Sequence, residues 1–260
     1  MKKILLFTVL FSQFCFGNCK YFICASNGLT FYPTKKEISL NSKFIIQGYA
    51  LSQKTINNLK ENKVYLEDHQ KNKIELEIIE ILKGEMELTQ AILKPKRQLE
   101  PNTIYSLRIL DLNKIDRNSL YRWNSNRKKR EPISWKTKDI IYNDLLNSNL
   151  ELEYYKDEAT LYGCGPAVYS VFNIKNVDEK EIWYRTEVVN IKTKSKTTYI
   201  LVNKGNKLSV GHGMCAGAFT FKDKGKYKVR FTPMNTDGKM SKPTKWINIK
   251  NPNNEKAFGF

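Results

Sequence analysis

The residues with the most reactive side chains lie close together near the end of the chain. His212, one of two histidines, stands three residues before Cys215 in the segment GHGMCAGAFTF. Such a pair can act as base and nucleophile or can bind zinc. In an extended segment, residues three apart point to opposite faces, and glycines at 211, 213 and 217 oppose a helix. A zinc site built on Cys164, His212 and Cys215 would also lack an evident fourth ligand. We therefore predict no catalysis and no metal here.

Other signatures of catalysis are missing as well. The sequence contains no G-x-S-x-G elbow, no Walker loop and no dinucleotide-binding fingerprint. The acidic residues between 75 and 87 alternate with apolar ones, as on the wet face of a strand, and do not mark the carboxylate pair of a glycosidase. We predict no catalytic residue and no cofactor.

The N-terminus predicts export. Residues 1–17 begin with Lys2 and Lys3, continue with an apolar run and end at Gly17, as a secretory signal peptide does. The run is too short to span a bilayer. Cleavage before Cys19 would instead give a lipid-anchored protein, although Asn18 fits that signal poorly. We expect a secreted, periplasmic or outer-envelope protein of a bacterium.

Export changes the interpretation of the cysteines. Loss of the signal peptide removes Cys15 and leaves an even number of cysteines in an oxidising compartment, where disulfides are the expected state. Glycines beside Cys164 and Cys215 would let the two backbones approach, so we predict a Cys164–Cys215 bridge. Cys19 and Cys24 could close a small local loop or cap the first domain separately.

One segment combines aromatic and basic side chains. In SLYRWNSNRKKREPISWKTK, the aromatic residues could hold a glycan ring while the cations attract acidic groups. The alternative is a solvated loop above aromatics that fill a core. The candidate binding residues are Tyr121, Trp123, Arg127, Lys128, Lys129, Arg130 and Trp135.

The whole chain is also basic. Its formal charge of +18 favours acidic partners, but it is rich in Lys, Asn and Ile throughout, as biased genomic composition would produce. Nucleic acid is not an expected partner, because no known nucleic-acid-binding module is present and the protein would act outside the cytoplasm.

The elements that must position these residues are short strands. Residues 103–110 alternate between apolar and polar, giving one buried and one wet face. The other predicted strands cover residues 43–50, 62–68, 72–78, 133–138, 150–155, 167–174, 181–191, 197–203, 217–221, 226–234 and 245–249, and only 51–62 suggests a short helix. Strand after strand without a long helix predicts β-sandwiches. We place domains at 25–138 and 150–250, a linker at 139–149 and a polar tail at 251–260.

Two stretches resemble known families. ILKPKRQLEPNTIYSLRI, followed by ISWKT, resembles bacterial Ig-like domains, and Leu99, Pro101, Thr103 and Tyr105 have the spacing of a tyrosine corner, whose hydroxyl bonds back to upstream backbone. GKYKVRFTPMNTDGKMSKPTKW, from 225 to 246, is similar to the last two strands of fibronectin type III-like domains, with a turn at Asp237–Gly238.

The two resemblances imply two tandem sandwiches in a non-enzymatic protein. It would bind an acidic glycan or a surface protein, or act as a structural spacer. The alternative is an accessory domain protein of a periplasmic or extracellular hydrolase.

The disulfide can be tested by thiol labelling. When the denatured, unreduced protein is treated with a maleimide and digested, Cys164 and Cys215 should carry no label, because a bridge of about fifty residues should form in this compartment. Labels on both cysteines would contradict the bridge and would reopen the pairing of His212 with Cys215.

Overall fold

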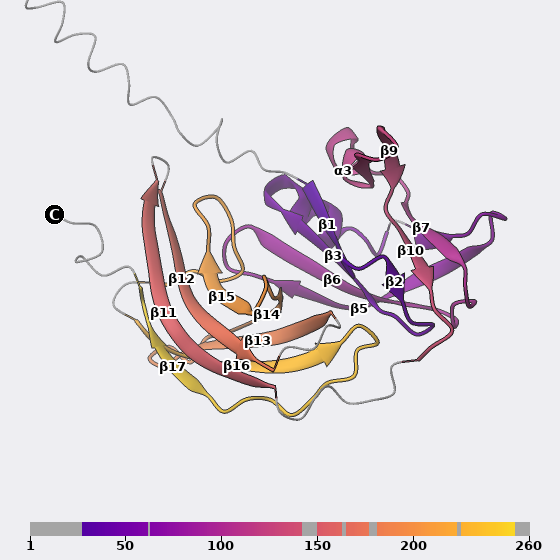
Figure 1. Cartoon of the computed structure of the whole chain (residues 1–260). Coiled ribbons are helices and arrows are strands. Elements are labelled where there is room, and N and C mark those ends of the chain that lie inside the picture. The colour runs from indigo at the N-terminus through magenta and orange to yellow at the C-terminus, as the bar shows by residue number, and fades with distance from the viewer. Residues whose placement is uncertain are drawn as a thin grey trace, which may run out of the picture.

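The protein is built almost wholly of β-strands. The computed structural model describes residues 28–61, 63–141, 150–162, 165–176, 181–222 and 225–252, and Figure 1 traces them. The predicted all-β class is confirmed. The first half contains β1 (Gly28–Tyr32), β2 (Glu37–Ile38), β3 (Phe44–Tyr49), β4 (Val64–Glu67), β5 (Lys73–Lys83), β6 (Leu88–Pro95), β7 (Ile104–Ile109), β8 (Tyr121–Asn124), β9 (Lys129–Pro132) and β10 (Ser134–Thr137). The second half contains β11 (Glu151–Tyr162), β12 (Gly165–Lys175), β13 (Ile182–Asn190), β14 (Lys196–Val202), β15 (Lys207–His212), β16 (Lys226–Asn235) and β17 (Ile247–Lys250).

The first half is a sheet that folds over on itself. Its strand order is β1-β3-β6-β5-β4-β7-β10-β2. The start of β5 pairs with β4 and the rest pairs with β6, with a register shift between Ile78 and Glu80. A bulge bends a strand, and so β5 can serve both layers. Leu66, Leu93 and Leu107 belong to the core between the layers.

The tyrosine corner is present where the sequence predicted it. The Glu100 backbone N–H donates to the Tyr105 hydroxyl at 3.1 Å. A second bond of the same kind was not predicted: the Tyr227 hydroxyl accepts from the Lys222 N–H at 2.7 Å and donates to the Lys222 carbonyl at 2.9 Å. In both corners the tyrosine follows its backbone partner by five residues and a buried apolar residue, Leu99 or Phe221, by six. That spacing is a signal the sequence could have supplied.

The second half is a sandwich of two sheets. A sheet in the order β11-β12-β15 faces another in the order β14-β13-β16-β17, and both layers are visible in Figure 1. Alternate residues of β13 point to opposite sides. Tyr184 and Val188 enter the core between the sheets, where Phe172 contacts Phe231 with ring centroids 4.9 Å apart.

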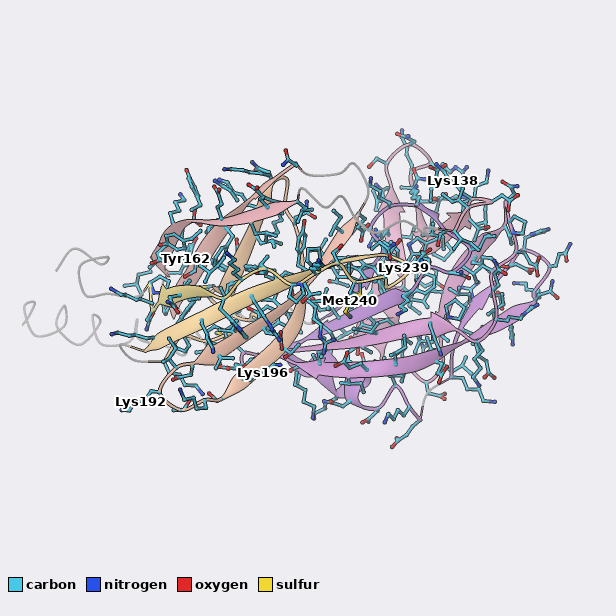
Figure 2. All side chains as sticks on the ribbon, turned by 90° about the horizontal axis from the view of Figure 1, so that it is seen from below. Lys138, Tyr162, Lys192, Lys196, Lys239 and Met240 are labelled. Atoms are coloured by element: carbon cyan, nitrogen blue, oxygen red, sulfur yellow. The ribbon has the colours of Figure 1, made fainter. Side chains whose placement is uncertain are left out.

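The other face of β13 packs against the first half. Trp183 and Ile200 lie in a buried cluster with Ile45, Leu82 and Ile92 of the first half, and Met234 completes it. In Figure 2, Lys239 and Met240 lie where the two halves meet. We call this contact the junction. The division into two domains stays a prediction, and each half leaves apolar side chains for the other to cover.

Polar groups at the junction are also paired. The Gln90 side chain donates to the Ile200 carbonyl and accepts from its N–H, both at 2.8 Å, much as a neighbouring strand would. Arg185 forms a two-pronged ion pair with Glu80, at 2.6 and 2.8 Å. Because unpaired polar groups are costly to bury, these bonds fix how the halves fit together.

Several local expectations need correction. The predicted strand at 217–221 is no strand, and only Gly217 forms bridges, one of them to Met86. Strands β1, β2, β6, β9 and β15 and the helix α3 (Lys114–Ser119) were not predicted. The short helix expected at 51–62 is present as η1 (Ala50–Ser52) and α2 (Gln53–Asn57).

Other expectations fall outside the described residues. These are the signal peptide at 1–17, Cys19, Cys24, most of the linker at 139–149 and most of the tail at 251–260. Within the described ranges, none of the helices has the length and apolar character that crossing a bilayer requires.

The junction predicts a difference between two glutamates of β5. E80A should lower the free energy of unfolding by about 1 kcal/mol, because Arg185 loses its carboxylate partner at a partly buried contact. E75A is the matched control: Glu75 pairs with Lys96, both side chains are 59% exposed, and the loss should stay within about 0.5 kcal/mol. Equal losses in urea unfolding would contradict the special role of Glu80.

Acid should remove the effect of E80A. The hydrogen bond from Arg185 holds the pKa of Glu80 below its ordinary value. The stabilisation is therefore present above the unfolded-state pKa, about 4.3, and is lost as the pH falls through the folded-state pKa. The difference between parent and E80A, measured by urea unfolding at several pH values, should be constant near neutrality and shrink in acid.

Candidate functional site

The aromatic and basic segment forms a small hairpin that projects from the first half. Strands β8 and β9 pair antiparallel, and Figure 1 shows them beside α3. Asn124 makes the turn: its Oδ1 accepts from the N–H groups of Asn126 and Arg127 at 3.0 and 3.1 Å. Lys128 has a positive φ of 48°. Asn at the start of a turn commonly supplies this local bond.

The pleat of the hairpin divides the predicted binding residues. Tyr121 and Trp123 alternate with Arg122 and Asn124 and so point to the opposite face. Arg130 lies directly across from Trp123 and shares its face. Tyr121 and Trp123 are 40% and 62% exposed, so two aromatic residues and one arginine form an open surface.

Trp135 is not part of that surface. It lies on β10, is only 3% exposed, and its ring contacts Phe44 with centroids 4.8 Å apart. Its Nε1–H donates to the Pro33 carbonyl at 2.8 Å. Trp135 therefore fills the core, which is the alternative to a binding role that the sequence left open.

The basic residues differ in their contacts. Arg127 pairs with Glu131 at 3.1 Å, and Arg130 donates to the Asn118 carbonyl at 3.3 Å. Asn124 also donates to Glu131, at 2.8 Å, and this bond, together with Arg127, holds the pKa of Glu131 below its ordinary value. Lys128 and Lys129 are exposed at the tip.

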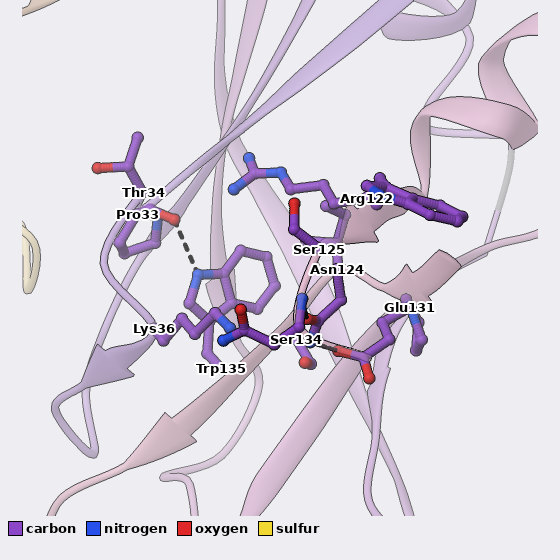
Figure 3. Close-up of a pocket in the computed structure, with 13 residues that line it drawn as sticks. Pro33, Thr34, Lys36, Arg122, Asn124, Ser125, Glu131, Ser134 and Trp135 are labelled. Atoms are coloured by element: carbon purple, nitrogen blue, oxygen red, sulfur yellow. Dashed lines mark hydrogen bonds between the residues drawn. The ribbon is translucent and has the colours of Figure 1, made fainter. Parts of the chain in front are cut away.

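A pocket lies beneath the hairpin. Its volume is about 380 Å³, and Figure 3 shows Arg122 and Ser125 on one side, Pro33 and Thr34 on the other, and the edge of Trp135 between them. We call it the hairpin pocket. Lys36, Asn124, Glu131 and Ser134 also line it. Most of these groups are hydrogen-bond donors or acceptors, and one aromatic ring lies among them.

Two cations at this pocket are available to a ligand. Within the described residues, neither the Arg122 guanidinium nor the Lys36 ammonium has a hydrogen-bond or ion-pair partner. Sequence reasoning missed both as site residues. Arg122 stands inside the segment already singled out, between Tyr121 and Trp123, so its place in a strand could have marked it. Lys36 is distant in sequence and had no such signal.

His212 and Cys215 are placed differently. His212 ends β15, is buried, and has Nδ1 2.8 Å from the Gly213 carbonyl, so Nδ1–H donates there. Cys215 is disulfide-bonded. Cys164 lies outside the described residues, so its pairing with Cys215 stays a prediction. Among the residues described, there is no cluster of three or more His, Cys, Asp or Glu that could hold a metal ion.

Comparison with known proteins gives structural similarity only. No family model matches the chain, and no curated protein matches it. Similar solved structures include a pullulanase from Anoxybacillus sp. LM18-11 complexed with maltotriose, with 10% identity, a TM-score of 0.26 and coverage of 86% of this chain and 25% of that one.

Two further solved structures are similar to this chain, also with low sequence identity and a low TM-score. The chicken CNTN1 FN1-FN3 domains have 12% identity, a TM-score of 0.27 and coverage of 87% of this chain and 63% of that one. A cytokine receptor complex has 7% identity, a TM-score of 0.26 and coverage of 88% and 99%. At these values the matches define neither a family nor an activity for this chain, which spans about a quarter of the pullulanase.

Tryptophan fluorescence can test the division of the aromatic residues. W123F should remove much of the acrylamide-accessible emission, because Trp123 is 62% exposed. W135F should leave that component in place and should lower stability by roughly 1–3 kcal/mol, since a buried carbonyl loses its donor and the core loses ring atoms. Quenching that falls more in W135F than in W123F would contradict this placement.

Proposed function

We propose that this protein is a non-enzymatic binding protein of the bacterial cell envelope or exterior, and that its hairpin pocket binds an acidic glycan. The observation that carries the proposal is a pair of cations, Arg122 and Lys36, that have no partner among the described residues and that line one pocket with the edge of Trp135.

The chemistry of the pocket suits a sugar chain with carboxylate or sulfate groups. A guanidinium binds such groups with two parallel hydrogen bonds, and an ammonium adds a second positive charge. The edge of the Trp135 ring lines the same pocket, and Ser125 and Ser134 supply neutral hydroxyl groups that can bond to the hydroxyls of a sugar. A pocket with both kinds of group distinguishes an acidic sugar from a bare anion.

The absence of an enzymatic role is part of the proposal. Among the described residues that line the hairpin pocket, the only carboxylate is that of Glu131, and Asn124 and Arg127 already bind it. Glycoside hydrolysis in most families needs two carboxylates about 5–10 Å apart. The pocket therefore favours binding over cleavage.

The location is also proposed from the sequence. The predicted signal peptide at 1–17 would export the chain, and the lipid anchor at Cys19 remains the alternative to a freely secreted form. Charge attraction accelerates the encounter of a basic protein with an acidic polymer.

The test is binding to immobilised polygalacturonate, with neutral dextran as the reference polymer. The double variant R122A/K36A should bind at least tenfold more weakly and should show a shallower dependence on salt, because contacts with a polyanion release counterions. K192A/K194A is the matched control: it removes the same charge from the β13–β14 turn, which lies in the second half, and should bind nearly as the parent does. Lys192 is labelled in Figure 2.

A second variant separates the pocket from the tip. Changing Arg127, Lys128, Lys129 and Arg130 to Ala should also flatten the salt dependence, by an amount that depends on how many of the four contact the polymer. If R122A/K36A and the control pair weaken binding equally, only net charge matters and the pocket is not the site. A parent that binds dextran as well as polygalacturonate would contradict an acidic ligand, and the role of hydrolase accessory or protein-binding module would then be the next to test.

A further inference from the structure

A second cavity lies between the two halves of the molecule. It has a volume of about 300 Å³ and is lined from the first half by Tyr32, Gln47 and Tyr49 and from the second by Tyr169 and Ser209. An adjoining cavity of about 620 Å³ shares Tyr49 and Ala216 with it. We call the two together the interdomain cleft. Ligand sites commonly occur in clefts of this size between domains.

Strand register explains why these side chains meet. In the first half, Thr30 lies opposite Gln47 and Gly28 opposite Tyr49, so the same faces of β1 and β3 present Gln47 and Tyr49. In the second half, Glu158, Tyr169 and Gly211 form one row across β11, β12 and β15. Both rows lie on hydrogen-bonded strands, so each wall of the cleft is formed by a β-sheet.

Three tyrosine hydroxyls are available as donors. Gln47 Nε2 donates to the Tyr49 hydroxyl at 2.5 Å, which leaves the proton of Tyr49 free to donate to a ligand. Among the described residues, the hydroxyls of Tyr32 and Tyr169 have no hydrogen-bond partner. Burial, with Tyr32 and Tyr169 nearby, raises the pKa of Tyr49 to about 12, and burial also raises the pKa of Tyr32 and of Tyr169. All three therefore keep their protons at neutral pH.

The charged groups at the cleft favour an anion. Lys204 and Lys207 line it, and neither forms an ion pair within the described residues, although the Lys207 ammonium lies 5.0 Å from the centre of the Tyr155 ring. Among the described residues that line the cleft, the only carboxylate is that of Glu158, and it pairs with Lys156 at 2.8 Å. The cleft thus offers several donors and two uncompensated positive charges.

The walls of the cleft are held in place before any ligand arrives. The Gly217 N–H donates to the Met86 carbonyl at 2.8 Å and the Glu85 N–H to the Ala218 carbonyl at 3.0 Å, and each bond joins the two halves. Gln90 bonds Ile200, which also lines the cleft. A site that is rigid in advance loses less entropy on binding.

We propose that the interdomain cleft is a binding site for a sugar residue that carries a carboxylate, with the hydroxyls of Tyr32, Tyr49 and Tyr169 and the ammonium groups of Lys204 and Lys207 as its donors. The tyrosine rings supply flat apolar faces for the sugar ring, and the donors match its carboxylate and hydroxyl oxygens. The site is separate from the hairpin pocket, and it specifies the same ligand class as the proposed function.

The experiment compares trigalacturonate with its methyl ester, which keeps the sugar rings and removes the charge. Binding is measured by calorimetry with the full chain, and the rings involved are identified from chemical-shift changes of labelled tyrosines. The parent should bind the acid at least fivefold more tightly than the ester. Y49F and Y169F each remove one hydroxyl and retain the ring, and each should weaken binding of the acid several-fold, as should K204Q.

Controls distinguish this site from the hairpin pocket. Y121F makes the same chemical change on the hairpin and should leave the tyrosine shifts of the cleft unchanged. R122A/K36A should leave the shifts of Tyr49 and Tyr169 unchanged, whereas Arg122 acts electrostatically on Tyr32. If Y49F, Y169F and K204Q bind like the parent while R122A/K36A does not, the cleft proposal is overturned and the hairpin proposal stands. The reverse pattern supports the cleft and overturns the hairpin pocket. Equal binding of acid and ester, or no binding of either with unchanged tyrosine signals, also overturns the cleft proposal.

Discussion

Both candidate sites depend on one buried contact, the packing of the outer face of β13, β14 and β16 against β3, β5 and β6. Trp183, Ile200 and Met234 are each 3% exposed or less there. Removing so much apolar surface from water is the main force that holds the halves together. The hydrogen bond of Gln90 and the Glu80–Arg185 ion pair form in only one alignment of the two halves, so they fix the orientation of one half relative to the other. The cleft keeps its shape because the halves cannot easily shift.

The same contact explains why β7 was predicted from its sequence and β6 was not. Strands with one wet face, such as β7 with Tyr105 and Leu107 buried, show the expected alternation. Strand β6 does not, because Ala91 and Leu93 enter the first core while Gln90 and Ile92 face the second half. A strand covered on both faces loses its period-two pattern. Local patterns predicted several strands of the junction, but they did not reveal β6 or that these strands pack against one another.

For the hairpin, local patterns distinguish the tryptophans only in part. Ile133, Trp135 and Thr137 alternate with polar neighbours, and all three are buried. Tyr121 and Trp123 alternate with Arg122 and Asn124, so neither face is apolar enough to mark a core side. Lys36 reaches the pocket through tertiary structure, since β2 pairs in parallel with β10 a hundred residues later in the chain. Non-local pairing of this kind cannot be derived from spacing.

The two sites are also linked through one short segment. Tyr32 lines the interdomain cleft, while the next residue, Pro33, lines the hairpin pocket. Glu181 of the second half holds this segment, accepting from the N–H groups of Thr34 and Lys35 at 2.7 and 3.0 Å. Its other oxygen accepts from Trp183 Nε1 at 2.9 Å, and Trp183 is buried in the junction. The second half therefore fixes a wall of the hairpin pocket as well, and the geometry of both sites follows from how the halves pack.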